Sequence, residues 1–334
     1  MAARRHLLGA GALGWVLVAG AAPAQQTVIN NGLAPPAAEN VIDAADSYGS
    51  YDAFVRNVGC GVIFPYDAPC AAPGAATQVA LVPGGLVGSG FWLGVYDTSS
   101  IAVSGGFAGN LRAHDSASVS ITGGSVDNTL EVNDSATVVL SGGSVGQFTR
   151  TYGGKLDIQG GSAARVQAAG HSTVTVTGGE LCYLSGNGYA EVRMRGGSVA
   201  EFVTSVFESR VRVTGGSIAG VLAANDSGDV VWSGGSVGGT IVAYGDSTIS
   251  VWGEGFAVDG VPVADGPIAA IEGVLSGTLA SGEPFANPIC HSGCLDDFDV
   301  PATGLITVPE PGRLLLDAAA LVTVAWVLRR RRRT

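Results

Sequence analysis

The chain repeats a pair of glycines at nearly constant intervals, and this feature restricts its fold more than any other. Nine Gly-Gly pairs make up this periodic series, and a degenerate tenth member, Gly253-Glu254-Gly255, follows them. After a first interval of 21 residues the spacing is 18 or 19 throughout. Such a period is typical of solenoids, in which each repeat packs only on its neighbours. The nine pairs lie at 84–85, 105–106, 123–124, 142–143, 160–161, 178–179, 196–197, 215–216 and 234–235.

Each repeat places alternating apolar residues before its glycine pair. Val119 and Ile121 begin this pattern, and it recurs in every later repeat up to Ile249 and Val251. Alternation with period two predicts short strands with one buried face. A further apolar residue follows each pair and leads into a second expected strand. These second strands are marked by Leu111, Leu130, Phe148, Val166, Leu184, Phe202 and Val221.

Strands this short cannot bury a face alone, whereas stacked coils can. We therefore predict an all-β fold, a parallel β-solenoid of about nine to ten coils stacked about 4.8 Å apart. Right-handed winding is expected, because parallel crossovers are almost always right-handed. The alternative is a left-handed hexapeptide helix, which also uses 18 residues per coil. It requires an apolar residue at every sixth position, and the uneven apolar spacing of this chain does not provide one.

The N-terminus has the three parts of a secretory signal. Arg4 and Arg5 precede an apolar segment over residues 7–21, and Ala22-Pro23-Ala24 supplies the small residues that signal peptidase selects. We expect residues 1–24 to be a signal helix that is cleaved after Ala24. Signal peptidase is accordingly an expected partner.

The C-terminus also has three ordered parts. A short motif precedes an apolar run over residues 314–328, and five arginines follow that run. The motif is Val308, Pro309, Glu310 and Pro311, and the basic residues are Arg329, Arg330, Arg331, Arg332 and Arg333. The prolines prevent regular helix around Glu310 and keep the motif extended.

This arrangement resembles the PEP-CTERM sorting signal of Gram-negative bacteria. The resemblance covers residues 308–334 and implies a sorting helix that tethers the chain transiently to the inner membrane. It further implies removal by an exosortase-like membrane protease or transpeptidase, and release to the cell surface or extracellular matrix. An ordinary single-pass anchor with its arginines in the cytoplasm is the alternative.

These signals divide the chain into six segments. Residues 1–24 are the signal peptide and residues 25–83 an N-terminal cap with irregular first coils. The repeat solenoid is expected over 84–255, followed by a C-terminal cap at 256–300. Residues 301–307 are expected to be a tether into the sorting segment at 308–334.

The charge of the chain limits its partners. It contains 17 basic and 28 acidic residues, a formal net charge of −11. Eight of the basic and two of the acidic residues lie in the terminal segments, so the exported part is more acidic still. Nucleic acid and anionic lipid would be repelled. We expect membrane contact through the terminal segments alone and allow an uncharged exopolysaccharide as a partner.

The five cysteines fit export to an oxidising compartment. Their spacing favours two short-range disulfides, Cys60–Cys70 and Cys290–Cys294. Cys182 falls near a predicted core position and is expected to be a buried thiol.

Aspartates recur in the turns between coils. Asp97, Asp115 and Asp134 are weak calcium candidates, and Asp226 and Asp246 are expected in equivalent turns. The simpler interpretation is that each aspartate hydrogen-bonds its own turn backbone. We predict no metal and no cofactor.

No catalytic residues are predicted. Arg193, Arg195, Arg210 and Arg212 should form a basic patch near Glu191 and Glu208, which ion pairing between strands explains. The aromatic residues are interpreted as scattered over different columns, with Trp232 in the core.

The function we expect is therefore that of a non-catalytic protein of the cell surface or extracellular matrix, associated with biofilm or exopolysaccharide. The repeats also resemble autotransporter adhesin passengers, which implies an adhesin-like role. The alternative is a β-helix enzyme that degrades polysaccharide, either a lyase or a hydrolase.

Overall fold

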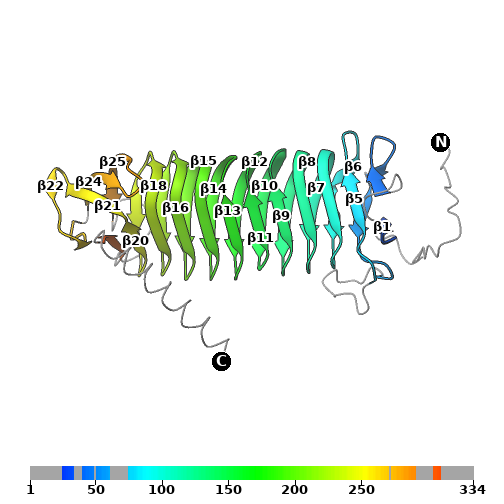
Figure 1. The fold of residues 1–334 in the computed structure, drawn as a ribbon, viewed down its shortest axis with the longest axis horizontal. Coiled ribbons are helices and arrows are strands. Elements are labelled where there is room, and N and C mark those ends of the chain that lie inside the picture. The colour runs from blue at the N-terminus through cyan, green and yellow to red at the C-terminus, as the bar shows by residue number, and fades with distance from the viewer. Residues whose placement is uncertain are drawn as a thin grey trace, which may run out of the picture.

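The computed structural model describes residues 25–33, 40–48, 50–60, 74–270, 272–290 and 304–309. Every element assigned in these ranges is a β-strand, and the strands join into one sheet wound as an elongated rod (Figure 1). The predicted all-β parallel solenoid is confirmed, with about nine turns. The two expected terminal helices lie outside the described ranges. Within those ranges, no helix is long and apolar enough to cross a membrane.

The strands fall into three groups along the chain. The first coils contain β1 (Gln25–Ile29), β2 (Val41–Ile42), β3 (Ser47–Tyr48), β4 (Tyr51–Val55), β5 (Gln78–Leu81), β6 (Leu86–Val95), β7 (Ser100–Ala113) and β8 (Ser118–Asn133). The middle contains β9 (Thr137–Leu140), β10 (Ser144–Tyr152), β11 (Lys155–Ile158), β12 (Ser162–Ala169), β13 (Thr173–Val176), β14 (Glu180–Asn187), β15 (Glu191–Val206), β16 (Arg210–Ile218), β17 (Val221–Asn225), β18 (Asp229–Val237), β19 (Ile241–Ala243) and β20 (Thr248–Val251). The C-terminal end contains β21 (Gly253–Val258), β22 (Val261–Pro262), β23 (Gly266–Pro267), β24 (Glu272–Leu279), β25 (Pro284–Cys290) and β26 (Leu305–Val308).

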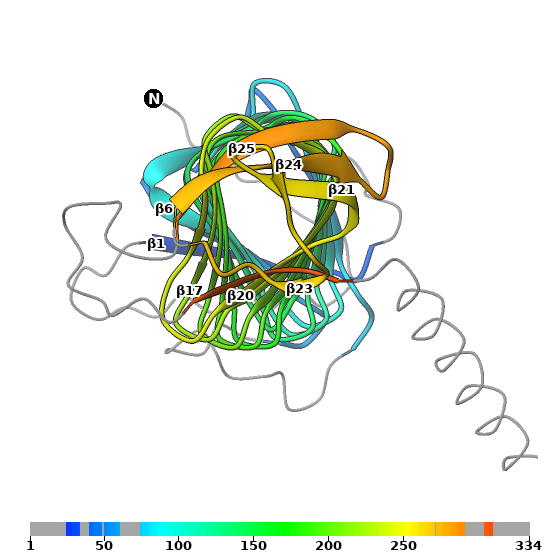
Figure 2. The same ribbon diagram turned by 90° about the vertical axis from the view of Figure 1, so that its left-hand side faces the viewer.

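Each coil pairs in parallel with the next. β9, β11 and β13 form one side of the rod, and β10, β12 and β14 form the other. Figure 2, seen along the rod, shows the coils superposed around a common axis. Equivalent side chains therefore stack in columns, and the inward columns make up a continuous apolar core.

The columns predicted from the alternation before each glycine pair are confirmed. All sixteen of their residues, from Val119 to Val251, are buried, including Trp232. The apolar residue after each pair is buried as well. The register pairs Val119 with Val138 and Val138 with Leu156, and it continues coil by coil to Ile249.

The predicted second-strand column is wrong in three coils. Phe148, Phe202 and Val221 point outward, and the next residue fills the core instead: Thr149, Val203 and Leu222 respectively. The reason is the length of the corner between the two strands. In these coils the second inward residue follows the buried residue after the glycine pair by four positions, as Thr149 follows Val145, whereas Val166 follows Ala163 by three. The longer corner shifts the inward position by one, and the ladder between β10 and β12 is irregular at this point.

Thr149 occupies this apolar column without a partner for its hydroxyl. Its Oγ1 is buried and finds no hydrogen-bond partner among the described residues. We expect Thr149→Val to raise the free energy of unfolding by about 1 kcal/mol, since it removes a buried polar group at nearly constant shape. Urea unfolding of the parent and the variant measures the difference.

Thr151 provides the matched control two residues away. Its Oγ1 lies 2.9 Å from Ser172 Oγ, and both side chains are buried. Thr151→Val should lower the free energy of unfolding by about 1 kcal/mol, because it leaves Ser172 without this bond. Equal effects of the two substitutions would contradict this interpretation.

The solenoid extends beyond the predicted repeat at its N-terminal end. β1 pairs in parallel with β4, and β2 pairs in parallel with β5. β4 pairs in turn with β6, and β5 pairs with β7. The first coils thus continue the same core, although their sequence lacks the regular glycine period.

The C-terminal cap is antiparallel, unlike the rod. β21 and β25 each pair with β24, and these strands cross the end of the rod in Figure 2. Phe285 in β25 packs edge-on against Trp232, with ring centroids 4.8 Å apart. Asn287 Nδ2 donates to the carbonyls of Val237 and Gly239 at 2.7 and 2.8 Å. The cap therefore covers the apolar interior and satisfies carbonyls of the last corner.

The expected tether at 301–307 is partly wrong. Leu305 to Val308 form β26, which pairs in parallel with β20 and in antiparallel with β23. Ile306 extends the apolar column of Ile249, and Val308 is fully buried. The physical reason is the alternation Leu-Ile-Thr-Val, which supplies one more amphipathic strand to the open end of the rod.

Candidate functional site

The Asp turns form one edge of the rod. Asp97, Asp115, Asp134 and Asp226 each have a φ between 55° and 59°. Glycine takes the same left-handed conformation in four other coils, at 153, 170, 188 and 245. The predicted placement of Asp246 in this series is wrong, because Gly245 takes the left-handed position and Asp246 follows it.

The carboxylates of these turns bind the neighbouring coil. The Asp97 amide donates to Asp115 Oδ2 at 3.0 Å, and the Asp115 amide donates to Asp134 Oδ2 at 3.1 Å. Asp97 itself accepts from the Asn57 amide and forms a buried ion pair with Arg56 at 3.2 Å. For Asp97, Asp115 and Asp134 the prediction that each aspartate caps its own turn is thus corrected, since each of these three binds the turn of the preceding coil.

This bonding also bears on the calcium candidates. Carboxylate oxygens that accept backbone amides are engaged in holding coils together rather than converging on a shared ion. Among the residues that the structure describes, no group of three His, Cys, Asp or Glu side chains could hold a metal.

The predicted arginine patch is held by ion pairs. Arg193 donates to both carboxylate oxygens of Glu191, at 2.9 and 2.6 Å, and Arg212 lies 3.9 Å from the same group. Arg210 binds Asp229 in the next coil at 2.7 Å. The bond from Arg193 is the main cause that holds the pKa of Glu191 below its usual value. Ion pairs thus engage three of the four arginines. Those of Arg210 and Arg212 join neighbouring strands, as the sequence suggested, whereas Arg193 and Glu191 belong to the same strand.

A different outward column gathers aromatic and arginine side chains. The register aligns Trp92, Asn110, Thr129, Phe148, Arg165, Tyr183 and Phe202 in successive coils. We call these seven residues the aromatic–arginine column. It runs along β6, β7, β8, β10, β12, β14 and β15, on the side of the rod opposite to β9, β11 and β13.

Members of the aromatic–arginine column stack on one another. The Arg165 guanidinium lies 4.8 Å from the Tyr183 ring centroid and 5.8 Å from that of Phe148. The Tyr183 and Phe202 rings are parallel within 14°, with centroids 5.6 Å apart. At the other end, Arg112 covers the Trp92 ring at 4.0 Å. Stacked rings and cations order these side chains into a firm, partly exposed surface.

The interpretation of the aromatics as scattered is therefore wrong for this column. The sequence does contain a signal for the aromatic–arginine column, because its residues recur with the same period as the core residues. The period that marks the inward columns holds for the outward positions as well. The one-residue shift at Phe148 and Phe202 concealed the alignment further.

Tyr183 offers a direct probe of the aromatic–arginine column. It hydrogen-bonds the Glu201 carboxylate, and this bond is the main cause that raises the pKa of Tyr183 above its usual value. We expect Glu201→Gln to lower that pKa toward the ordinary phenol value, since a neutral amide no longer opposes the phenolate. This hydrogen bond requires the protonated phenol of Tyr183. It is therefore present at pH values below the usual pKa of tyrosine, and it is lost as the pH rises through the raised pKa of Tyr183.

A pH titration of phenolate absorbance, compared between parent and variant, measures this shift. Glu131→Gln is the matched control, because Glu131 pairs with Arg112 at 2.7 Å in a different part of the face. A control variant that shifts the titration as much as Glu201→Gln would contradict the assignment.

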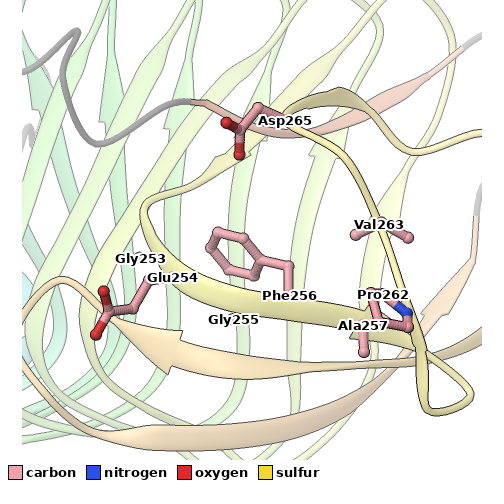
Figure 3. A pocket seen from close by; sticks show the side chains of 8 residues that line it. All are labelled: Gly253, Glu254, Gly255, Phe256, Ala257, Pro262, Val263 and Asp265. Atoms are coloured by element: carbon pink, nitrogen blue, oxygen red, sulfur yellow. The ribbon is translucent and has the colours of Figure 1, made fainter.

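The cap contains a shallow hollow between β21 and the loop after β22. Gly253, Gly255, Phe256 and Ala257 line it, together with Glu254, Pro262, Val263 and Asp265. Figure 3 shows its two carboxylates, Glu254 and Asp265, on different sides of the Phe256 side chain. Glycoside hydrolysis uses two carboxyl groups that flank one bond, and Glu254 and Asp265 are the two carboxylates that line this hollow.

Several predicted site residues lie outside the described ranges or remain untested. Ala22, Ala24, Cys70, Cys294, Glu310, Pro311 and the five terminal arginines are not among the described residues. Cys60 and Cys290 are buried, and the two disulfide pairings stay predictions. Cys182 is a free cysteine that is half-buried rather than in the core, because it lies between inward Leu181 and outward Tyr183.

No protein-family model matches this chain, and no curated protein or solved structure matches it.

Proposed function

We propose that this chain is an exported, non-catalytic rod of the cell surface or extracellular matrix, adhesin-like or associated with biofilm exopolysaccharide. The observation that carries the proposal is the aromatic–arginine column on the outside of a continuous solenoid. A repeating surface of this kind offers an extended polymer several contacts at once, which raises its overall affinity without any single strong site.

Export is proposed from the two ends of the sequence. The signal segment would be cut after Ala24 by signal peptidase, and the PEP-CTERM-like tail would be removed by an exosortase-like enzyme. The fold supports this proposal in one respect, because β26 ends at Val308 and Pro309 follows it directly. The rod thus includes Val308, the first residue of the motif. Right-handed winding also belongs to the proposal, on the general preference of parallel crossovers.

Mass spectrometry of the material released by producing cells tests export. We expect a chain that begins at Gln25 and lacks Thr334. Pro309→Ala should leave the tail attached, since the variant loses the extended motif. Released chain that still carries Thr334 would contradict removal of the tail.

The same material tests the proposed disulfides. Peptide mapping without reductant should recover Cys60 linked to Cys70 and Cys290 linked to Cys294, with Cys182 open to alkylation. Recovery of all five cysteines as alkylated thiols would contradict an oxidising destination.

The second candidate is a polysaccharide-degrading enzyme, for which the cap hollow is the relevant observation. Glu254 and Asp265 are its two carboxylates. If they acted on a polymer, new reducing ends would appear and Glu254→Gln would abolish them.

A further inference from the structure

The most exposed aromatic side chains of the rod lie on one edge. Tyr152 is 48% exposed, Tyr189 59% and Phe207 55%. His171 is exposed as well and stacks on Tyr189, with ring centroids 5.0 Å apart and planes within 9°. These four residues come from four successive coils, at or next to the left-handed turn of each. We call them the aromatic turn ridge.

Phe207 has a backbone conformation that is unfavourable for its residue type. Its φ is 58°, a left-handed conformation that is unusual for a bulky residue. The other described turns of this series place Asp or Gly there, at 97, 115, 134, 153, 170, 188, 226 and 245. A strained backbone with an exposed apolar ring lowers stability on two counts. Strain of this kind is found where a residue serves contact with another molecule.

The aromatic turn ridge and the aromatic–arginine column border the same outward face. Phe148 and Tyr152 belong to one strand, four residues apart, so the two rows are separated by about 13 Å. Between them the register aligns Arg150, Gln167, Ser185 and Thr204, which are all partly exposed. The face thus has aromatic rings along both margins and hydrogen-bonding side chains along its middle.

The charges of this face point to an uncharged ligand. Arg150 and Arg165 are balanced by Glu201 and Glu208, and the two glutamates already bind Tyr183 and Tyr189. The chain as a whole has a net charge of −11 and would repel an anionic polymer. Aromatic faces bind the apolar faces of sugar rings, and amide and hydroxyl groups bind sugar hydroxyls.

We propose that this face binds a neutral polysaccharide whose chain runs along the rod axis, between the aromatic turn ridge and the aromatic–arginine column. The inference rests on the proposed function and assigns the site for it. Phe207 and Tyr189 make the outer contacts, and the strain at Phe207 is retained because its ring serves the ligand rather than the fold.

Two substitutions separate binding from folding. Phe207→Asp installs the residue that four equivalent turns already use, so it removes the ring and relieves the backbone. We expect its melting temperature to rise while its affinity falls at least about tenfold. Tyr189→Ala should lower affinity similarly with little change in melting temperature. Val261→Ser is the matched control, since Val261 is 66% exposed but lies in the cap, and it should bind like the parent.

Affinity gel electrophoresis of the purified full chain measures binding. The neutral polymers are dextran and hydroxyethylcellulose, and the acidic polymers are alginate and hyaluronate. We expect retardation of the parent by a neutral polymer, with reduced retardation of the Phe207→Asp and Tyr189→Ala variants.

Three binding results and one stability result would contradict the assignment in distinguishable ways. If a neutral polymer retards parent and variants equally, this face is not the site, although the proposed function stands. If the acidic polymers alone retard the chain, the ligand class is wrong. If none of the four polymers retards the parent, both the site and the polysaccharide role are wrong, whereas export is tested separately. A fall in the melting temperature of Phe207→Asp would show that the ring serves the fold.

Discussion

Gly143→Ala is expected to lower the free energy of unfolding by about 4 kcal/mol. Gly143 has a φ of 75°, and a Cβ there would lie 2.7 Å from the carbonyl oxygen of Gly124 in the preceding coil. Two effects combine, since an L-residue is strained at this φ and the coils cannot move apart without breaking the ladder. Urea unfolding followed by circular dichroism measures the loss.

Gly170→Ala separates these two effects. Gly170 also has a positive φ, 62°, but a Cβ at this position meets nothing within 4 Å. Its substitution should therefore show the backbone strain alone, about 1–2 kcal/mol. If the two glycine variants lost the same stability, close stacking of the coils would not be the reason for the glycine column.

Trp232→Ala is expected to lower the free energy of unfolding by about 4 kcal/mol as well, because it empties a large site in the core. Trp232 is 0% exposed, contacts Phe285 of the cap, and donates its Nε1 proton to the Gly234 carbonyl at 3.2 Å. The loss should concentrate at the C-terminal end. Hydrogen exchange of β25 should accelerate more than that of β9, which is several coils away.

Trp92→Ala is the control for Trp232→Ala. Trp92 lies on the outer face, where its main ring contact is the Arg112 guanidinium at 4.0 Å. This contact accounts for about 1 kcal/mol or less. A larger loss for Trp92 than for Trp232 would contradict the assignment of inside and outside.

The core could be predicted from the sequence because it is local and periodic. Val119, Ile121 and their equivalents follow a strict alternation beside each glycine pair. The inward positions of one repeat therefore predict those of the other repeats. The error at Phe148 has the same origin. Apolar character alone does not show which of two adjacent residues faces inward when the preceding corner gains a residue.

The closing strand and the proposed binding face could not be predicted in this way. β26 joins β20 across a long sequence separation, and Thr307 Oγ1 lies 3.2 Å from Ser250 Oγ although the two residues are 57 positions apart in the sequence. The sequence from Leu305 to Val308 does not indicate that this strand pairs with β20. The aromatic turn ridge depends on where each turn places its left-handed residue, and Phe207 lacks the glycine or aspartate that marks the others.

The central claim, a rod that holds polysaccharide without cutting it, is tested most directly by one paired measurement. The purified full chain is incubated with a panel of neutral and acidic polysaccharides, and bound polymer and newly formed reducing ends are measured in the same samples. We predict that a neutral polymer is bound and that reducing ends stay at the level of polymer alone. Reducing ends that increase with protein concentration and time would contradict the claim and establish an enzyme.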